Sequence, residues 1–230
     1  MQVGAIVAAA GPGTRLGGRT KALVPLHGRT ALSRVLEVLL SLDEIDRVVV
    51  AAPPTRLELV SGEVATLKPW KQVQVCAGGE TRQQSVRAGL AALGGCDYVL
   101  VHDAARPLAT ADLFRRVLAA AESAGAAIPA LPPRDAVKRV EGVRVVESLE
   151  RSHLVLAQTP QAFAYQLLER AHFEAADAGL HGEDDAQLVA ATGHAVVVVE
   201  GEPANIKLTT ADDLEMLEAL LEERESTPTA

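Results

Sequence analysis

The chain has 230 residues, of which 48% are apolar and 23% are charged. This length and composition are typical of a globular chain with a full hydrophobic core, and they exclude a disordered or fibrous protein. The formal net charge is −8 and only 3% of the residues are aromatic. The chain therefore lacks the positive charge and the stacking side chains that favour nucleic acid as a partner. Small-molecule chemistry is the favoured class of function.

The cysteine content and the first apolar segment indicate the compartment. Two cysteines, Cys76 and Cys96, are too few for a disulfide framework or a four-cysteine zinc site, and they fit a reducing environment. The first apolar run has no basic residue before it and is interrupted by Gly11 and Pro12. It predicts neither a signal peptide nor a membrane span. We expect a cytoplasmic protein with no membrane partner.

Short runs of Val, Leu and Ala alternate with longer amphipathic segments along most of the chain. This alternation is typical of βα units that build a mostly parallel sheet flanked by helices, so the predicted fold class is α/β. Helices are expected over residues 30–42 and 82–93, where apolar side chains recur on one face. The expected strands cover residues 3–8, 47–51, 72–76, 98–102, 126–130 and 195–199.

Residues 131–152 interrupt this alternation. Apolar and charged side chains alternate there on both sides of Glu141 and Gly142, which predicts a protruding β-hairpin arm. An isolated hairpin is marginally stable in water, so the arm needs a partner surface, and two copies exchanging arms about a two-fold axis would supply one. The alternative is a loop folded back on its own domain. We expect one domain over residues 1–230 that includes the arm.

The first chemical feature is the loop AAAGPGTRLG at residues 8–17, directly after the first strand. Gly11 and Gly13 allow the backbone to approach a phosphate closely, and Arg15 and Lys21 add positive charge. The spacing matches neither GxGxxG nor GxxxxGK[ST], so a dinucleotide oxidoreductase and a P-loop NTPase both lose support. A simple tight turn is the alternative, but two cations beside the glycines favour a phosphate site.

A second loop, GGETRQQSVRAGL at residues 78–90, also follows a strand and opens a helix. Gly79 provides accessible backbone groups, and the Ser85 hydroxyl can reach a base or a ribose. In the simpler interpretation, Glu80 and Thr81 only cap the helix.

A third loop ends the strand in VLVHDAARP, residues 99–107. Asp103 can bind a metal or a hydroxyl, and Arg106 can bind phosphate in a bidentate manner. The alternative is that these two side chains pair with each other on the surface. His102 is expected to be a packed residue that ends the strand.

Further charged residues lie closer to the C-terminus. Arg151 and Lys207 are isolated cations, and spacing alone indicates ordinary surface charges. The segment GEDDAQL at residues 182–188 is either an acidic metal cluster or the capped start of a helix, with capping favoured. The residues by themselves thus predict a nucleotide or phosphate site lined by Arg and Lys, and they do not identify the substrate.

Six ordered motifs together resemble one known family. AAAGPGTRLG with Lys21, GGETRQQSV, HDAARP, RDAVKR, TPQAF and NIKLT are similar in order and separation to those of 2-C-methyl-D-erythritol 4-phosphate cytidylyltransferases. The likeness covers roughly residues 3–217, and it is far more specific than any single loop. It implies a Rossmann-like sheet of the nucleotidyltransferase type. It also implies the transfer of CMP from CTP to methylerythritol phosphate in the non-mevalonate isoprenoid pathway, with release of pyrophosphate.

The resemblance implies roles for individual residues. The positions that match nucleotide-binding residues are Ala9, Ala10, Gly11, Gly79, Glu80 and Ser85. Two groups of cations match catalytic positions, the first stabilising the transition state and the second positioning the acceptor phosphate: Arg15 with Lys21, and Arg151 with Lys207. Other contacts of methylerythritol phosphate are matched by Asp103, Arg106 and Thr159.

The implied chemistry brings two polyanions together. A phosphate oxygen of the acceptor attacks the α-phosphorus of CTP and needs no general base because it is already ionised. Positioning and electrostatic stabilisation are then the main tasks, with Mg²⁺ bound mainly through the CTP phosphates and no metal ligands expected from the protein. The resemblance also implies a homodimer clasped through the arms, in which Arg151 contributes to the neighbour's site.

Two departures from the family pattern lie near the site. Thr20 precedes Lys21 in a shortened approach where the family usually has a proline, and Ala136 follows Asp135 where a threonine is usual. Ribitol 5-phosphate cytidylyltransferases are an alternative with the same chemistry. Sugar-1-phosphate nucleotidyltransferases share GxGTRL, but they are generally longer and lack the TPQ and NIK motifs. A catalytically silent nucleotide-binding regulator is the alternative from another class.

Overall fold

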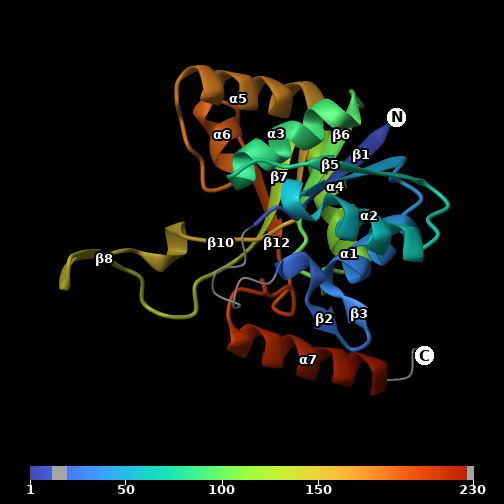
Figure 1. Cartoon of the computed structure of the whole chain (residues 1–230). Helices are drawn as coiled ribbons and strands as arrows, with labels where there is room; N and C mark the ends of the chain where they lie inside the picture. The colour runs from blue at the N-terminus through green and yellow to red at the C-terminus, as the bar shows by residue number, and fades with distance from the viewer. Residues whose placement is uncertain (12–19, 227–230) are drawn as a thin grey trace.

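The computed structural model describes residues 1–11 and 20–226 and is built around an eight-stranded sheet (Figure 1). The strand order is β10-β7-β11-β6-β1-β4-β5, and β12 also pairs with β7. The strands are β1 (Val3–Ala8), β4 (Arg47–Ala52), β5 (Gln72–Ala77), β6 (Tyr98–Asp103), β7 (Ala126–Leu131), β10 (Leu156–Ala157), β11 (Gln161–Ala164) and β12 (Val197–Glu200).

The sheet is mostly parallel, as the sequence predicts. Strand β1 pairs in parallel with β4 and β6, β4 with β5, and β7 with β12. All six predicted strands are present: β1 has the predicted bounds, and the ends of the other five shift by one or two residues. Strand β11 was not predicted; it lies antiparallel between β6 and β7 and joins the two parts of the sheet. Its four residues, QAFA, follow Pro160 and are too few to show a clear alternation.

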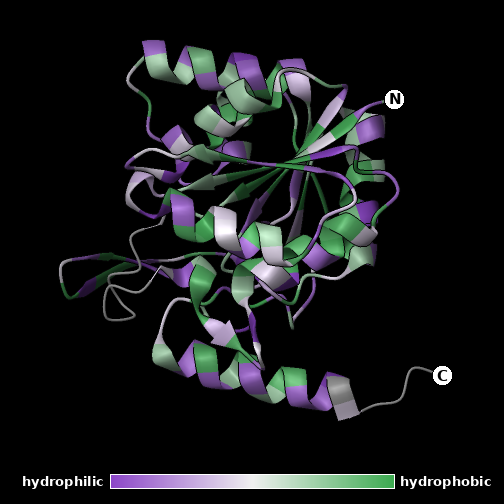
Figure 2. Cartoon of the chain, turned by 45° about the vertical axis from the view of Figure 1, so that its right-hand side comes forward, coloured by the Kyte–Doolittle hydropathy of each residue, from purple (hydrophilic) through white to green (hydrophobic). Residues whose placement is uncertain are grey.

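Helices cover both faces of the sheet because successive side chains of each strand point to opposite sides. Val3, Ala5 and Val7 of β1 belong to one apolar cluster, which is covered by α1 (Ala31–Ser41), α2 (Leu57–Thr66) and α4 (Ala111–Ala124). Ile6 belongs to the opposite cluster, covered by α3 (Arg82–Leu93), α5 (Tyr165–Asp177) and α6 (Asp185–Ala191). In Figure 2 the strands at the centre of the sheet are mainly green, whereas the helices around them carry both green and purple residues. The two predicted helices are confirmed as α1 and α3.

A third apolar cluster places the last helix against a small hairpin. Helix α7 (Ala211–Ser226) packs Leu217 and Leu221 against Leu26 of the hairpin β2 (Pro25–Leu26) and β3 (Arg29–Thr30). The cluster also contains Leu208, whose N–H donates to the Ala105 carbonyl at 2.7 Å. The segments beside positions 21 and 207 are therefore held by one packed unit.

The predicted hairpin arm is confirmed. Strands β8 (Lys138–Glu141) and β9 (Arg144–Ser148) form a separate antiparallel pair that projects from the sheet (Figure 1). Gly142 turns the chain between them with a φ of 59°, a conformation that glycine adopts without strain. The large apolar side chains of the arm are exposed in a single chain: Val140, Val143, Val145 and Val146. None of the described helices is long and apolar enough to cross a membrane.

Glycine at position 89 sets the distance between α3 and β1. A Cβ at Gly89 would lie 2.5 Å from the Ile6 Cγ2. We predict that Gly89→Ala lowers the free energy of unfolding by about 1 kcal/mol, because overpacking outweighs the gain in helix propensity. Gly62 in α2 has open space around it, so Gly62→Ala should instead raise stability by up to about 1 kcal/mol. Urea denaturation of both variants measures this, and stabilisation by both would contradict the predicted packing.

Candidate active site

A cavity of about 260 Å³ opens at the carboxyl edge of the sheet. After β1 the chain moves to β4 on one side, and β6 later joins the other side of β1. The strand order reverses at this point, which is where open α/β sheets bind ligands. The lining residues are Ala8, Ala9, Ala10, Gly11, Lys21, Ala22, Glu80, Thr81, Arg82, Ser85, Asp103, Ala104, Ala105 and Lys207.

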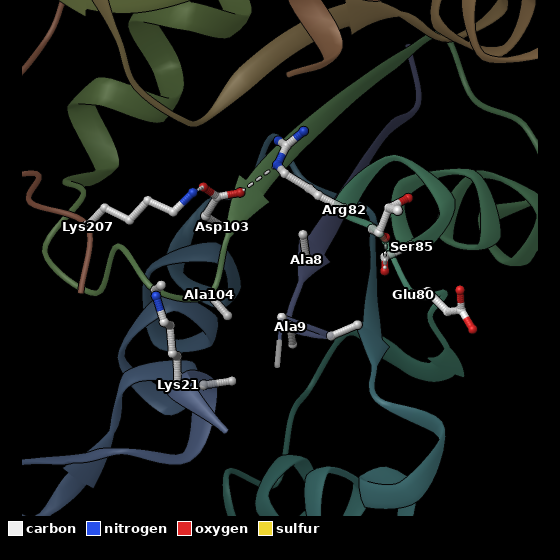
Figure 3. A pocket seen from close by; sticks show the side chains of 14 residues that line it. Ala8, Ala9, Lys21, Glu80, Arg82, Ser85, Asp103, Ala104 and Lys207 are labelled. Carbon is white, nitrogen blue, oxygen red and sulfur yellow. Dashed lines mark hydrogen bonds and ion pairs between the residues drawn. The ribbon is translucent and has the colours of Figure 1, made fainter. Parts of the chain in front are cut away.

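Much of the predicted site comes together in this cavity. The predicted residues that line it are Ala9, Ala10, Gly11, Lys21, Glu80, Ser85, Asp103 and Lys207. Lys21 opens the short 3₁₀ helix η2 (Lys21–Leu23), so the altered approach through Thr20 still brings it to the cavity. Figure 3 shows Lys21 and Lys207 on the same side of the cavity as Asp103, with Ser85 and Glu80 on the other. The cavity therefore has a cationic side and a side formed by the loop before α3.

Four of the predicted residues that the structure describes do not line the cavity: Gly79, Arg106, Arg151 and Thr159. Arg151 begins the 3₁₀ helix η4 (Arg151–His153) at the base of the arm, where its guanidinium donates to the Arg134 carbonyl at 2.6 Å. It does not line the cavity of its own chain. Arg15 lies outside the residues that the structure describes.

The loop before α3 is held by its own hydrogen bonds. Thr81 caps the helix and forms a capping box with Gln84, so capping by Thr81 is confirmed, while Glu80 and Thr81 both line the cavity as well. The Gly79 N–H donates to the Ser85 Oγ at 3.1 Å, and the Glu80 N–H donates to the Gln84 Oε1 at 2.8 Å. These two donors are used within the loop, and the Ser85 hydroxyl also lies within hydrogen-bond distance of the Gly79 and Thr81 carbonyls. A carbonyl oxygen can accept two hydrogen bonds, so the loop carbonyls are the backbone groups best suited to meet a ligand.

Close approach between two loops requires glycine at position 78. A Cβ there would lie 2.7 Å from the Ala10 Cβ and 2.9 Å from the Ser85 Oγ. Real side-chain contacts do not reach such distances, so any larger residue would push the loop after β5 away from the loop after β1. The narrow cavity between them depends on this contact.

Asp103 is the electrostatic centre of the cationic side. Its carboxylate lies 2.9 Å from the Arg82 Nε and 2.7 Å from the Lys207 Nζ. Burial would raise the pKa of Asp103, but the charges of Arg82 and Lys207 hold that pKa well below its usual range. The Asp103 carboxylate is therefore ionised. Its ion-pair partners are Arg82 and Lys207, and Arg106 is not one of them.

Arg106 joins loops instead of facing the cavity. Its guanidinium donates to the Asn205 carbonyl at 2.7 Å and to the Ala157 carbonyl at 3.5 Å. Burial lowers the pKa of Arg106, and the negative charge of Asp103 offsets part of this shift. The alternative in which Asp103 pairs with Arg106 is thus wrong, because the Arg106 guanidinium binds backbone carbonyls of distant segments. The predicted contact of Arg106 with substrate remains a prediction.

Arg82 is a charged residue of the cavity that the motifs did not single out. They predict it only as the first residue of a helix, yet its guanidinium bridges Asp103 and Asp185, the latter at 2.6 Å. Burial would lower the pKa of Arg82, but both carboxylates raise it above its ordinary value. Asp184 caps α6 by accepting from the Gln187 N–H, which confirms capping for GEDDAQL. The sequence feature that could have pointed to this ion pair is Asp185, the second aspartate of GEDDAQL.

The hydrogen bonds of His102 assign it a neutral tautomer. The Asp103 N–H donates to the Thr159 Oγ1, and the Thr159 hydroxyl lies 3.1 Å from the His102 Nδ1. That hydroxyl donates to Nδ1 while the Nε2–H donates to the Arg106 carbonyl at 3.1 Å. Burial lowers the pKa of His102 to about 4. His102 is packed as predicted, although the strand runs one residue further, to Asp103.

The TPQ and NIK motifs are connected through buried amides. The Asn205 Nδ2 donates to the Thr159 carbonyl at 2.8 Å and to the Gln158 Oε1 at 3.3 Å. The Gln158 Nε2 in turn donates to the Glu202 carbonyl. These bonds tie the segment before Lys207 to the segment that carries Thr159, behind Asp103. Thr159 therefore supports the strand end, and its predicted contact with substrate remains a prediction.

Comparison with known proteins identifies the family. The family model for IspD, 2-C-methyl-D-erythritol 4-phosphate cytidylyltransferase, matches residues 3–223. The chain belongs to this family. A 2-C-methyl-D-erythritol 4-phosphate cytidylyltransferase of Geobacillus kaustophilus is 40% identical over 225 residues, which cover 97% of this chain and 99% of that protein.

Other cytidylyltransferases of the family extend the comparison. The bifunctional enzyme IspD/IspF of Anaeromyxobacter dehalogenans is 45% identical over 221 residues; the match covers 94% of this chain and 56% of the length of that relative. The crystal structure of the Thermus thermophilus cytidylyltransferase is 38% identical in sequence and has a TM-score of 0.80. The match covers 96% of this chain and 100% of that chain. The fold class predicted from the sequence is thereby confirmed.

The buried histidine predicts a pH dependence of stability. Between about pH 6.5 and 4 the unfolded chain binds a proton at position 102 that the folded chain does not bind. The free energy of unfolding should therefore fall as the pH drops through this window, by about 3 kcal/mol for this residue. Urea denaturation at pH 7 and pH 4.5 should show a smaller loss for His102→Gln than for the unaltered protein. An NMR titration of His102 with a midpoint near 6.5 would rule out the assigned burial effect.

Proposed function

We propose that this protein transfers CMP from CTP to 2-C-methyl-D-erythritol 4-phosphate and releases pyrophosphate. The observation that carries the proposal is the cavity at the sheet edge, in which Lys21 and Lys207 face the glycine-containing loop after β1. Two lysines and a closely approaching backbone suit a ligand with several phosphates. Membership of a family named for this reaction supports the choice of substrates.

The proposed reaction makes one bond and breaks one bond at phosphorus. A phosphate oxygen of the acceptor forms a bond to the α-phosphorus of CTP, and the bond from that phosphorus to the leaving pyrophosphate breaks. The protein must hold two anions in line and stabilise charge on the leaving oxygens. Lys21, together with Arg15, would act on the triphosphate, and Lys207 on the acceptor phosphate. The overall charge of −8 does not oppose this, because the field within the cavity is local.

The loop before α3 suits cytosine better than uracil. The Gly79 and Glu80 N–H groups are already donated within the loop. Carbonyl oxygens there can accept from the amino group of cytosine, whereas uracil presents an oxygen at the same position. A site built on such hydrogen bonds rejects the mismatched base because its own groups are left unpaired.

Magnesium would enter with the nucleotide. Within residues 1–11 and 20–226 there is no group of three or more His, Cys, Asp or Glu side chains arranged to hold a metal. The carboxylates at the cavity are those of Glu80 and Asp103, and Asp103 is paired with two cations. Mg²⁺ prefers phosphate oxygens and water with few protein ligands, so we propose that the CTP phosphates hold it and that it neutralises their charge.

We propose that the active form is a homodimer joined through the arms. The arm exposes Val143 completely and Val145 at 62%, which is unfavourable for apolar side chains in water. Arg151 stands at the arm base, away from its own cavity. Exchange of arms about a two-fold axis would bury the valines and bring Arg151 to the acceptor side of the neighbour's cavity. A cytoplasmic location and a single domain remain predictions.

A pyrophosphate-release assay tests the proposed reaction. We expect turnover with CTP and methylerythritol phosphate, and at least about a hundredfold lower kcat/KM with UTP because the loop carbonyls would face an oxygen. Ribitol 5-phosphate serves as the matched acceptor. Turnover with ribitol 5-phosphate alone would replace the proposed acceptor, and no turnover with either acceptor would favour a nucleotide-binding regulator.

The arm supplies a second test. Deleting residues 134–150 should give folded monomers that bind CTP but barely turn over, because each site loses the neighbour's cation. Val145→Asp should weaken the dimer in the same way, while Leu59→Asp on α2, a position of similar exposure, should not. Sedimentation and turnover are measured at one protein concentration. A fully active monomer of the intact chain would refute the proposed assembly.

A further inference from the structure

The ion pairs of the cavity continue into the protein beyond the residues that line it. Lys207 pairs with Asp103, Asp103 with Arg82, and Arg82 with Asp185. The next member is His172, whose Nε2 lies 2.9 Å from the Asp185 Oδ1. His172 and Asp185 come from α5 and α6, are at most 2% exposed, and do not line the cavity.

Stability alone does not explain this arrangement. Burying two carboxylates requires full compensation, and apolar residues of similar volume often serve a core as well or better. The compensation here is also incomplete, because the Arg82 Nη2 and the His172 Nδ1 are buried and have no hydrogen-bond partner. Unsatisfied buried polar atoms are rare and mark places where a requirement other than stability decides the residue.

The geometry fixes the orientation of Arg82. Its Nε edge meets Asp103 at 2.9 Å and its Nη1 meets Asp185 at 2.6 Å. A planar guanidinium held along two directions by carboxylates has little freedom to rotate. Figure 3 marks the contact between Arg82 and Asp103, which lies at the cavity, with a dashed line. Asp103 therefore receives one cation that is fixed from behind and a second, Lys207, whose side chain is 44% exposed.

This difference between the two cations matters when an acceptor phosphate arrives. A phosphate bound at Lys207 would compete with Asp103 for the ammonium group, and the Asp103 carboxylate would then depend on Arg82. Asp185 can tolerate a weaker ion pair with Arg82 because its carboxylate also accepts a hydrogen bond from His172. Burial would raise the pKa of Asp185, but Arg82 and the His172 hydrogen bond keep it below its ordinary value, so it remains an anion behind Arg82.

We propose that Asp185 and His172 are positioning residues for the acceptor side of the site. They hold Arg82 against Asp103, so that Asp103 stays in place when Lys207 turns to the acceptor phosphate. This inference rests on the proposed function, since it concerns the binding of methylerythritol phosphate. It assigns no contact with substrate to either residue.

The experiment compares four variants with the unaltered protein. Asp185→Asn removes the anion behind Arg82. His172→Gln keeps an amide nitrogen near the position of Nε2, whereas His172→Leu removes the donor. Asp184→Asn is the matched control, because Asp184 caps the same helix and has no ion pair with Arg82. The readouts are kcat, the KM for each substrate, the Kd of CTP by calorimetry, and Tm.

Asp185→Asn and His172→Leu should lower kcat/KM for methylerythritol phosphate by about tenfold to a hundredfold, the size expected for a displaced binding group. The Kd of CTP should stay within about twofold, because the proposed positioning acts on the acceptor side and not on the nucleotide side. His172→Gln should recover most of the acceptor kinetics. Asp184→Asn should lower Tm without changing the kinetics of the acceptor more than the binding of CTP.

Two results would overturn the inference in an active enzyme. One is unchanged acceptor kinetics in both Asp185→Asn and His172→Leu. The other is a loss that affects CTP and acceptor equally and follows Tm, as a purely structural role requires. Inactivity of the unaltered protein with CTP and methylerythritol phosphate is a separate result; it would remove the proposed function first and this inference with it.

Discussion

The rest of the site depends on one buried, ionised carboxylate at the end of strand β6. Asp103 is almost fully buried, and a buried charge is tolerated only when it is paired. Arg82 from the start of α3 and Lys207 from the loop before α7 meet that requirement. Both segments are therefore held at the carboxyl end of β6. The need to compensate one anion thus brings Lys207, which the proposed reaction uses, to the cavity beside Arg82.

The sheet and its loops place that carboxylate with little freedom. Strand β6 lies between β1 and the antiparallel β11, so its end is flanked by the loop after β1 and by Thr159. The Asp103 N–H donates to the Thr159 hydroxyl, and buried amides connect Thr159 to the segment before Lys207. Positioning of this kind suits a reaction in which the protein orients ionised phosphates and supplies no general base.

The two sides of the cavity are built by different means. On the cationic side, ion pairs between separate segments determine the geometry. On the opposite side, the capping box of α3 and the close contact at Gly78 shape a loop whose N–H groups are used internally. A flexible ammonium can follow a phosphate during the reaction, whereas a loop fixed by its own hydrogen bonds can discriminate between bases.

The sequence by itself determined the local elements and where the chemistry lies along the chain. Six strands, the helices α1 and α3 and the arm follow from short-range periodicity and from turn residues such as Gly142, because these depend on neighbours in the chain. For the same reason, glycines and cations directly after a strand were enough to place Lys21 at a ligand-binding edge. The family resemblance, carried by six motifs in order, added the reaction.

Only the tertiary structure decided which charges meet. Arg82 and Asp185 are separated by 103 residues, and no local pattern connects them. Asp103 and Arg106 are three residues apart, yet they do not pair, because backbone carbonyls from segments near Ala157 and Asn205 bind the guanidinium. Strand β11 likewise depends on its neighbours β6 and β7, since four residues carry too little pattern of their own. The partner of a buried charge is chosen by what folding brings within a few ångströms, and sequence separation does not report that distance.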